Sequence, residues 1–268
     1  MYEYLYKYRK IGNIDSFEID ENTLKMLRDG ELYFSNPKSF NDPFDSKFTY
    51  IIDGTNEELI QNMVEKGKTL AWAKKMIETY SRKEIHEKYF KNLNERLDII
   101  RVFCLTETYL STLMWSHYGQ NHYGICIGIH IHDYKNYPNI RIRGDQVLPI
   151  TKNYDPQYIP ICPVKYTNDR PQPINVLRNK KQKMNDFILT KSLDWEYEKE
   201  QRIMLPIDRI KKNPVKIVVS QIGEIIFGLR TPFEMIKEIK LLTNNIRGIK
   251  YYQIEENQRT FALARKEI

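Results

Sequence analysis

The sequence has few cysteines and no long apolar run, and each absence argues against a class of protein. Its three cysteines are an odd number without C-x-x-C spacing, which argues against a disulfide framework and against a structural zinc site. No stretch of about 18 apolar residues is present to span a membrane, and the opening MYEYLYKYRK has no apolar run of signal-peptide length. We therefore expect a cytoplasmic protein in a reducing compartment, without a membrane partner or a bound metal.

The sequence also lacks an interdomain linker and the glycine-rich motif of dinucleotide-binding folds. No Pro/Gly/Ser-rich stretch divides the chain, and its 268 residues, 41% of them hydrophobic, can bury a sizeable core. We therefore predict a single domain over residues 1–268. No G-x-G-x-x-G follows a predicted strand, so an NAD site of the Rossmann type is not expected.

The pattern of apolar residues predicts an α+β fold with a central, mostly antiparallel sheet flanked by helices. Alternating segments typical of strands are separated by helical patterns without a regular βαβ repeat. Residues 55–99 differ, because their apolar side chains recur at helical spacings among many charges, which predicts a helical insertion or side layer. Strands are expected in the segments YEYLYKYRKI, ELYFS, RVFCLTE, YGICIGIHI and EIIFG.

The charge balance points weakly to an anionic partner. Lys and Arg number 42 against 35 Asp and Glu, which gives a formal charge of +7. Such an excess favours a nucleotide or a nucleic acid without requiring one.

Residues 103–129 are the first candidate site, because they combine polar, aromatic and glycine residues at unusual density. The pattern places Trp115, Ser116, His117 and Tyr118 at the end of a short helix between two strands, where side chains are held rigidly and can face a cleft. Alternatively, Trp115 and Tyr118 are core residues and His117 serves in a hydrogen-bond network.

Glu198 and Glu200 in EYEKEQRIML form the second candidate site. Residues two apart in a strand point to the same face, so the two carboxylates are expected to converge. Paired carboxylates can hold a substrate hydroxyl and orient an attacking nucleophile. Alternatively, they lie on the solvated face of an exposed strand.

Several of these segments together resemble one family. They are LYKYR, ELYFSNPKSFNDPFD, FCLTE followed by MWSHYGQNHYGICIGI, DWEYEKEQRIM and EIIFG. The combination resembles the bacterial domain family of unknown function numbered twenty-nine seventy-one, over nearly the whole chain. That family label implies no activity.

A more distant resemblance is to the ADP-ribosyltransferase fold. In that fold an Arg or His on an early strand, a Ser/Thr motif on a middle strand and a Glu or E-x-E on a later strand surround NAD. Here Arg9, the T-x-T of Thr106 and Thr108, and the E-x-E of Glu198 and Glu200 follow the same order.

The second resemblance implies that NAD is the substrate and assigns roles around it. Arg9 would pair with the pyrophosphate and Thr106 and Thr108 would fix the Arg and Glu side chains. Glu200 would hold a ribose hydroxyl and stabilise the oxocarbenium-like centre, while Glu198 orients the acceptor. The aromatic residues that would sandwich nicotinamide are Tyr8, Trp115 and Tyr118.

Three functions are therefore open. The first is an NAD-consuming ADP-ribosyltransferase or glycohydrolase, acting as a toxin or anti-phage defence effector on a protein or nucleic-acid acceptor. The second is a metal-independent nuclease or nucleotide hydrolase that uses His117 and His122, as paired acid and base, with Arg202. The third is a sensor module that binds a nucleotide without turning it over.

Overall fold

The computed structural model describes residues 3–88, 98–144, 146–149, 155–175, 177 and 184–268. The chain divides into two compact units, of which the first comprises residues 1–35, 101–164 and 194–268 and the second residues 36–100 and 165–193. The single domain expected over residues 1–268 stays a prediction.

A large mixed sheet forms the centre of the first unit, with the strand order β11-β15-β6-β1-β7-β17-β18-β19. β17 and β18 run parallel, whereas the pairs β11–β15, β6–β1, β1–β7, β7–β17 and β18–β19 are antiparallel. With the helices around it, this sheet confirms the α+β class. Its strands are β1 (Tyr4–Arg9), β6 (Ile100–Thr106), β7 (Ile125–His130), β11 (Cys162–Pro163), β15 (Glu200–Pro206), β17 (Ile222–Phe227), β18 (Lys250–Glu256) and β19 (Leu263–Glu267).

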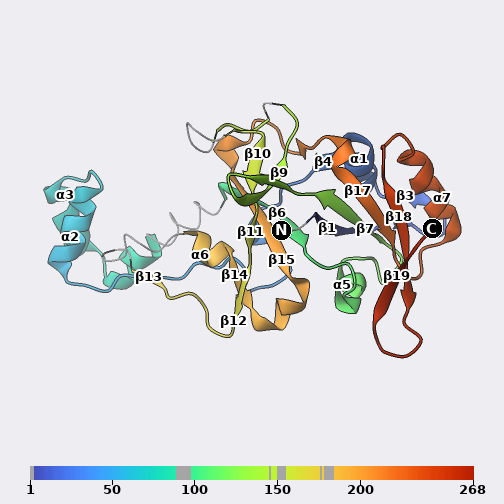
Figure 1. Cartoon of the computed structure of the whole chain (residues 1–268). Coiled ribbons are helices and arrows are strands. Elements are labelled where there is room, and N and C mark those ends of the chain that lie inside the picture. Colours follow the sequence, from blue (N-terminus) through green and yellow to red (C-terminus); the bar gives the residue numbers. More distant parts are fainter. Residues whose placement is uncertain (1–2, 89–97, 145, 150–154, 176, 178–183) are drawn as a thin grey trace. The chain divides into compact units, whose positions relative to one another are not determined.

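The two faces of this sheet carry different side chains. Helices α1 (Glu21–Asp29) and α7 (Phe233–Leu242) pack on one face against an aliphatic core, which we call the aliphatic face. Helix α5 (Thr112–His117) packs on the other, and Figure 1 shows α1 and α5 on opposite sides of the sheet. We call this second side the aromatic face, and its buried residues are Tyr6, Tyr8, Met114, Trp115, Cys126, Ile226, Tyr252 and Ile254.

Strand register assigns further residues to the aromatic face. Tyr6 lies opposite Thr106 of β6 and opposite Gly128 of β7, and Glu224 of β17 also lies opposite Gly128. Because directly opposed residues in a sheet point to the same side, all four belong to the aromatic face.

Local sequence signals set the helix bounds. The Asp20 side chain accepts a hydrogen bond from the N–H of Thr23 at the start of α1, and Gly30 ends the helix in the left-handed conformation, at φ +71°. The hydroxyl of Ser111 caps α5 by accepting from the N–H of Met114. Trp115, Ser116 and His117 thus lie on a short helix between two strands, as expected.

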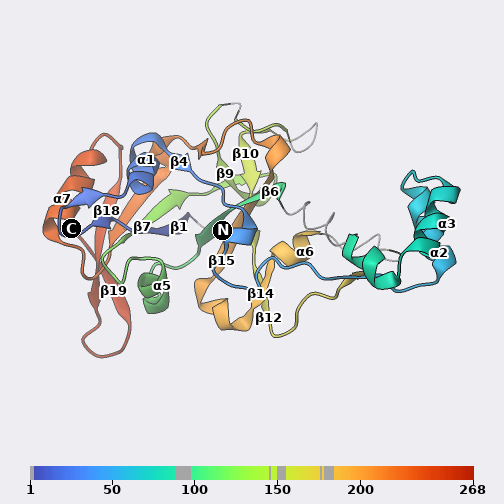
Figure 2. The ribbon, with the colours of Figure 1, turned by 180° about the vertical axis from the view of Figure 1, so that it is seen from behind.

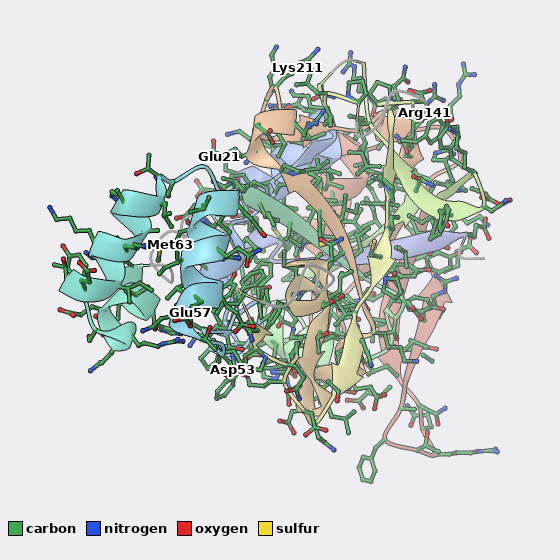
Figure 3. The ribbon with its side chains drawn as sticks, turned by 90° about the vertical axis from the view of Figure 1, so that its left-hand side faces the viewer. Glu21, Asp53, Glu57, Met63, Arg141 and Lys211 are labelled. Carbon is green, nitrogen blue, oxygen red and sulfur yellow. The ribbon has the colours of Figure 1, made fainter. Side chains whose placement is uncertain are left out.

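The remaining elements of the first unit are short and lie around the sheet. Figure 2 shows them from behind, and Figure 3 labels Arg141 at the end of β9. They are β2 (Gly12–Asn13), β3 (Glu18–Ile19), β4 (Glu31–Leu32), β8 (His132–Tyr134), β9 (Tyr137–Arg141), β10 (Tyr158–Pro160), η2 (Leu193–Glu198), η3 (Ile207–Arg209), β16 (Val215–Lys216) and η4 (Val219–Gln221).

The second unit has its own small core, made by Leu59, Met63, Ala73 and Ile85. Met63 of α2 lies on the side of the helix that faces α3, as Figure 3 shows. These helices fall within the stretch expected to be helical, of which residues 89–97 lie outside the described residues. The elements are η1 (Pro37–Ser39), β5 (Tyr50–Ile51), α2 (Asn56–Glu65), α3 (Leu70–Thr79), β12 (Lys165–Thr167), β13 (Ile174–Asn175), α6 (Met184–Ile188) and β14 (Thr190–Ser192). No helix among the described residues is both long and apolar enough to cross a membrane.

Candidate functional site

The two glutamates of the E-x-E motif do not share a strand. Glu198 is the last residue of the 3-10 helix η2, Lys199 follows with a left-handed φ of +43°, and Glu200 begins β15. Both side chains are buried, with 3% and 6% of their surface exposed. The prediction that strand alternation brings them together is therefore wrong, and so is the alternative of a solvated strand face, because a turn at Lys199 separates two buried carboxylates.

Glu198 is held by two residues of the first candidate stretch. The Thr106 hydroxyl on β6 donates to the Glu198 carbonyl oxygen, and it accepts from the N–H of Thr108 at 3.1 Å. The Tyr118 hydroxyl donates to Glu198 Oε1 at 2.7 Å. The structure thus brings Thr106, Thr108, Tyr118 and Glu198 together on the aromatic face.

Glu200 is instead one half of a buried ion pair. Its Oε1 accepts from Arg202 Nε at 2.7 Å and its Oε2 from Arg202 Nη2 at 2.9 Å. Arg202 is fully buried, so this bidentate contact neutralises two charges inside the unit. Burial raises the pKa of the neighbouring Cys104 thiol, and the negative charge of Glu200 raises it further.

Lys7 is a charged residue beside the site that sequence analysis missed, and it lies on the aliphatic side of β1, opposite Ile127. Its Nζ donates to the carbonyl oxygen of Cys104 at 2.9 Å and lies 4.8 Å from the centre of the Phe103 ring. Burial lowers the pKa of Lys7, while the nearby charges of Glu200 and Glu198 act to raise it. A lysine between the buried Tyr6 and Tyr8 was the available signal.

Arg9 lies elsewhere. Its Nη2 is 3.3 Å from Asp20 Oδ1, and its Nε donates to Thr23 Oγ1 at 3.3 Å, at the start of α1. Because alternate residues of β1 point to opposite faces, Arg9 leaves the sheet on the side away from Tyr6 and Thr106. The predicted convergence of Arg9 with Thr106 is therefore wrong, since the guanidinium is used to anchor α1.

Trp115 and Tyr8 are buried and pack against each other on the aromatic face. Trp115 has no exposed surface, its Nε1 donates to the carbonyl oxygen of Tyr109 at 2.8 Å, and its ring meets that of Tyr8 edge-on at 4.9 Å. Neither ring can sandwich nicotinamide in this arrangement, so the alternative that Trp115 is a core residue is confirmed. Of the three predicted aromatic ligands, Tyr118 is the one that reaches a carboxylate.

The two histidines occupy different environments. His117 is exposed at the end of α5, and its ring centre lies 6.3 Å from that of Tyr197, which precedes Glu198. His122 Nε2 lies 3.2 Å from Ser116 Oγ, and burial lowers the pKa of this imidazole. His117 therefore borders the Glu198 site, whereas His122 is engaged by Ser116.

A second charged group on the aromatic face was also missed. Glu224 is buried, and its Oε2 accepts both from the Tyr6 hydroxyl at 3.1 Å and from Arg265 Nη1 at 2.8 Å. Gly128 leaves room for this contact, because a Cβ there would lie 3.0 Å from Glu224 Cβ and 3.2 Å from the Tyr6 ring. In the part of the chain that the structure describes, no group of three or more His, Cys, Asp or Glu is arranged to hold a metal ion.

Comparison with known proteins gives a match to a family model. Residues 114–203 match the model of the family described as a protein of unknown function, DUF2971. Neither a curated protein nor a solved structure matches the chain.

The match confirms the family expected from the sequence motifs. The DUF2971 segment contains Tyr118, Glu198, Glu200 and Arg202, whereas Thr106 precedes it. The contact between Tyr118 and Glu198 therefore joins two parts of the family segment that are 80 residues apart.

Proposed function

We propose that the chain is an NAD-consuming enzyme of the ADP-ribosyltransferase type, which cleaves the bond between nicotinamide and ribose. The observation that carries this proposal is the buried carboxylate of Glu198. Its main chain is fixed by the Thr106 hydroxyl and its Oε1 accepts a hydrogen bond from the hydroxyl of Tyr118. The order of hydroxyl on a middle strand and glutamate before a later strand agrees with the distant resemblance to that fold.

Cleavage of the bond between nicotinamide and ribose is favoured by a negative charge held in a fixed position. When nicotinamide leaves, positive charge develops on C1′ and the ring oxygen of the ribose, and a preorganised carboxylate stabilises this charge most where water is excluded. Nicotinamide takes the electron pair of the broken bond, and water or another nucleophile then attacks C1′ and gives up its proton. Glu198, at 3% exposure, provides such an environment.

Tyr118 suggests how the substrate engages. The half-buried phenol donates a hydroxyl hydrogen bond to Glu198 Oε1 at 2.7 Å. A ribose hydroxyl is a donor of the same kind, so it would take the place of the phenol on this oxygen.

This proposal exchanges the roles expected of the two glutamates. Both oxygens of Glu200 accept hydrogen bonds from the guanidinium of Arg202, so its charge is already balanced and its lone pairs are directed at protein groups. Glu198 is therefore the better candidate for the ribose contact, and Glu200 for holding β15 and Arg202 in place.

The test is release of nicotinamide from NAD by the purified protein, measured by chromatography. The transferase proposal predicts release, with transfer or hydrolysis distinguished by whether free ADP-ribose accumulates. Binding of NAD without release would favour the sensor module. Cleavage of RNA or DNA without metal, with NAD left intact, would favour the nuclease.

A further inference from the structure

Arg265 of β19 is clamped between two tyrosine rings that come from different parts of the chain. Its Cζ lies 4.4 Å from the centre of the Tyr109 ring, in the segment that links β6 to α5, and 4.0 Å from that of Tyr252 on β18. Its side chain keeps 26% of its surface exposed. A guanidinium stacked on aromatic rings loses little further freedom when it binds a ligand, because its plane is already oriented.

The ion pair with Glu224 occupies only part of this guanidinium. Arg265 Nη1 donates to Glu224 Oε2 at 2.8 Å. A guanidinium has five N–H donors, and the described residues accept no further hydrogen bond from Arg265. Nε and Nη2 are therefore available to an anion, and the matched geometry of such donors favours phosphate and carboxylate groups.

The Arg265 group and the Glu198 site belong to one connected face. Thr106, which holds Glu198, lies opposite Tyr6 in the sheet, and Tyr6 in turn donates to Glu224. β6 and β17 are separated by three strand steps, through β1 and β7, or roughly 14 Å at the usual strand spacing.

We infer that Arg265 is the phosphate-binding residue of this face and that it receives the diphosphate of a nucleotide. The class of ligand rests on the proposed function. The phosphate site itself rests on the clamped, partly exposed guanidinium. It also supplies the cation that Arg9, bound to Asp20, does not.

Calorimetric titration of the full chain with ADP, with adenosine as the phosphate-free probe, tests the inference. Arg265→Lys keeps the charge for Glu224 but loses the planar fork, and we expect it to weaken ADP binding about 10- to 100-fold. Adenosine binding should not change. Arg259→Lys is the matched control, because Arg259 is an exposed arginine in the loop of the same β18–β19 hairpin, and it should bind ADP like wild type.

Tyr109→Leu provides a second variant that leaves the Arg265–Glu224 pair in place, and it should also weaken ADP binding. Equal ADP affinity in wild type and Arg265→Lys, equal weakening in the Arg259 control, or no ADP binding by wild type would each overturn the inference. Arg265-dependent ADP binding without nicotinamide release would support the phosphate site and reject the proposed enzyme. Nicotinamide release together with ADP binding that is unaffected by Arg265→Lys would support the proposed enzyme and reject the phosphate site.

Discussion

The two faces of the central sheet are built from the same strands and differ in almost every other respect. On β7, Ile125, Ile127 and Ile129 point into the aliphatic core and have no exposed surface. Cys126 and Gly128, between them, point to the aromatic face, where Tyr6 reaches Glu224. Alternation with a period of two thus lets one strand serve packing on one side and charged contacts on the other.

This difference shows where each kind of stability comes from. The aliphatic face gains from apolar burial, which depends on the volume that the side chains fill. The aromatic face holds the carboxylates of Glu198, Glu200 and Glu224 out of water, and each is compensated by hydrogen bonds. Substitutions on the two faces should therefore fail in different ways.

The largest effect on stability is expected for Glu200→Gln. It removes the carboxylate that binds Arg202 in two places and leaves a fully buried guanidinium short of its counter-charge. Breaking such a buried pair costs about 3–5 kcal/mol in the free energy of unfolding. Urea denaturation measures this loss, and a midpoint equal to that of wild type would show that the pair contributes nothing.

Ile127→Ala tests the opposite face. Removing a fully buried branched side chain from the aliphatic core should cost about 2–5 kcal/mol of unfolding free energy. Nicotinamide release per folded molecule should stay at the wild-type rate, because Ile127 points away from Glu198 and from the Thr106 and Tyr118 hydroxyls that hold it. A folded Ile127→Ala protein that has lost nicotinamide release would show that the aliphatic face also affects the site.

Gly128→Ala tests the aromatic face at the position next to Ile127. The added methyl would lie 3.0 Å from Glu224 Cβ and 3.2 Å from the Tyr6 ring, so Tyr6 and Glu224 must move apart. Overpacking of this kind costs about 1–3 kcal/mol. Thermal unfolding gives the stability, and a raised Kd for ADP in the folded variant would show that the disturbance reaches the Arg265 group.

Local signals predicted much of the fold. Alternation in β1 and β7 acts within a few residues, so sequence alone placed these central strands correctly. The family was also recognisable, because its motifs are contiguous in the chain.

The site was harder to predict because its contacts are long-range. Tyr118 meets Glu198 across 80 residues, and Tyr6 meets Glu224 across 218. The turn at Lys199 requires a left-handed φ in a residue other than glycine, which no pattern indicated. Arg9 was assigned to the site from its place in a resemblance, whereas its actual partner, Asp20, is set by the packing of α1.

The central claim is that Glu198 is the carboxylate that stabilises the breaking bond. The most direct test is the rate of nicotinamide release from NAD by Glu198→Gln, measured beside wild type at saturating NAD. We predict a rate about 10²–10³-fold lower in a protein whose unfolding free energy changes by no more than about 1 kcal/mol, because the amide oxygen still accepts from Tyr118. A folded Glu198→Gln protein that releases nicotinamide at the wild-type rate would contradict the account.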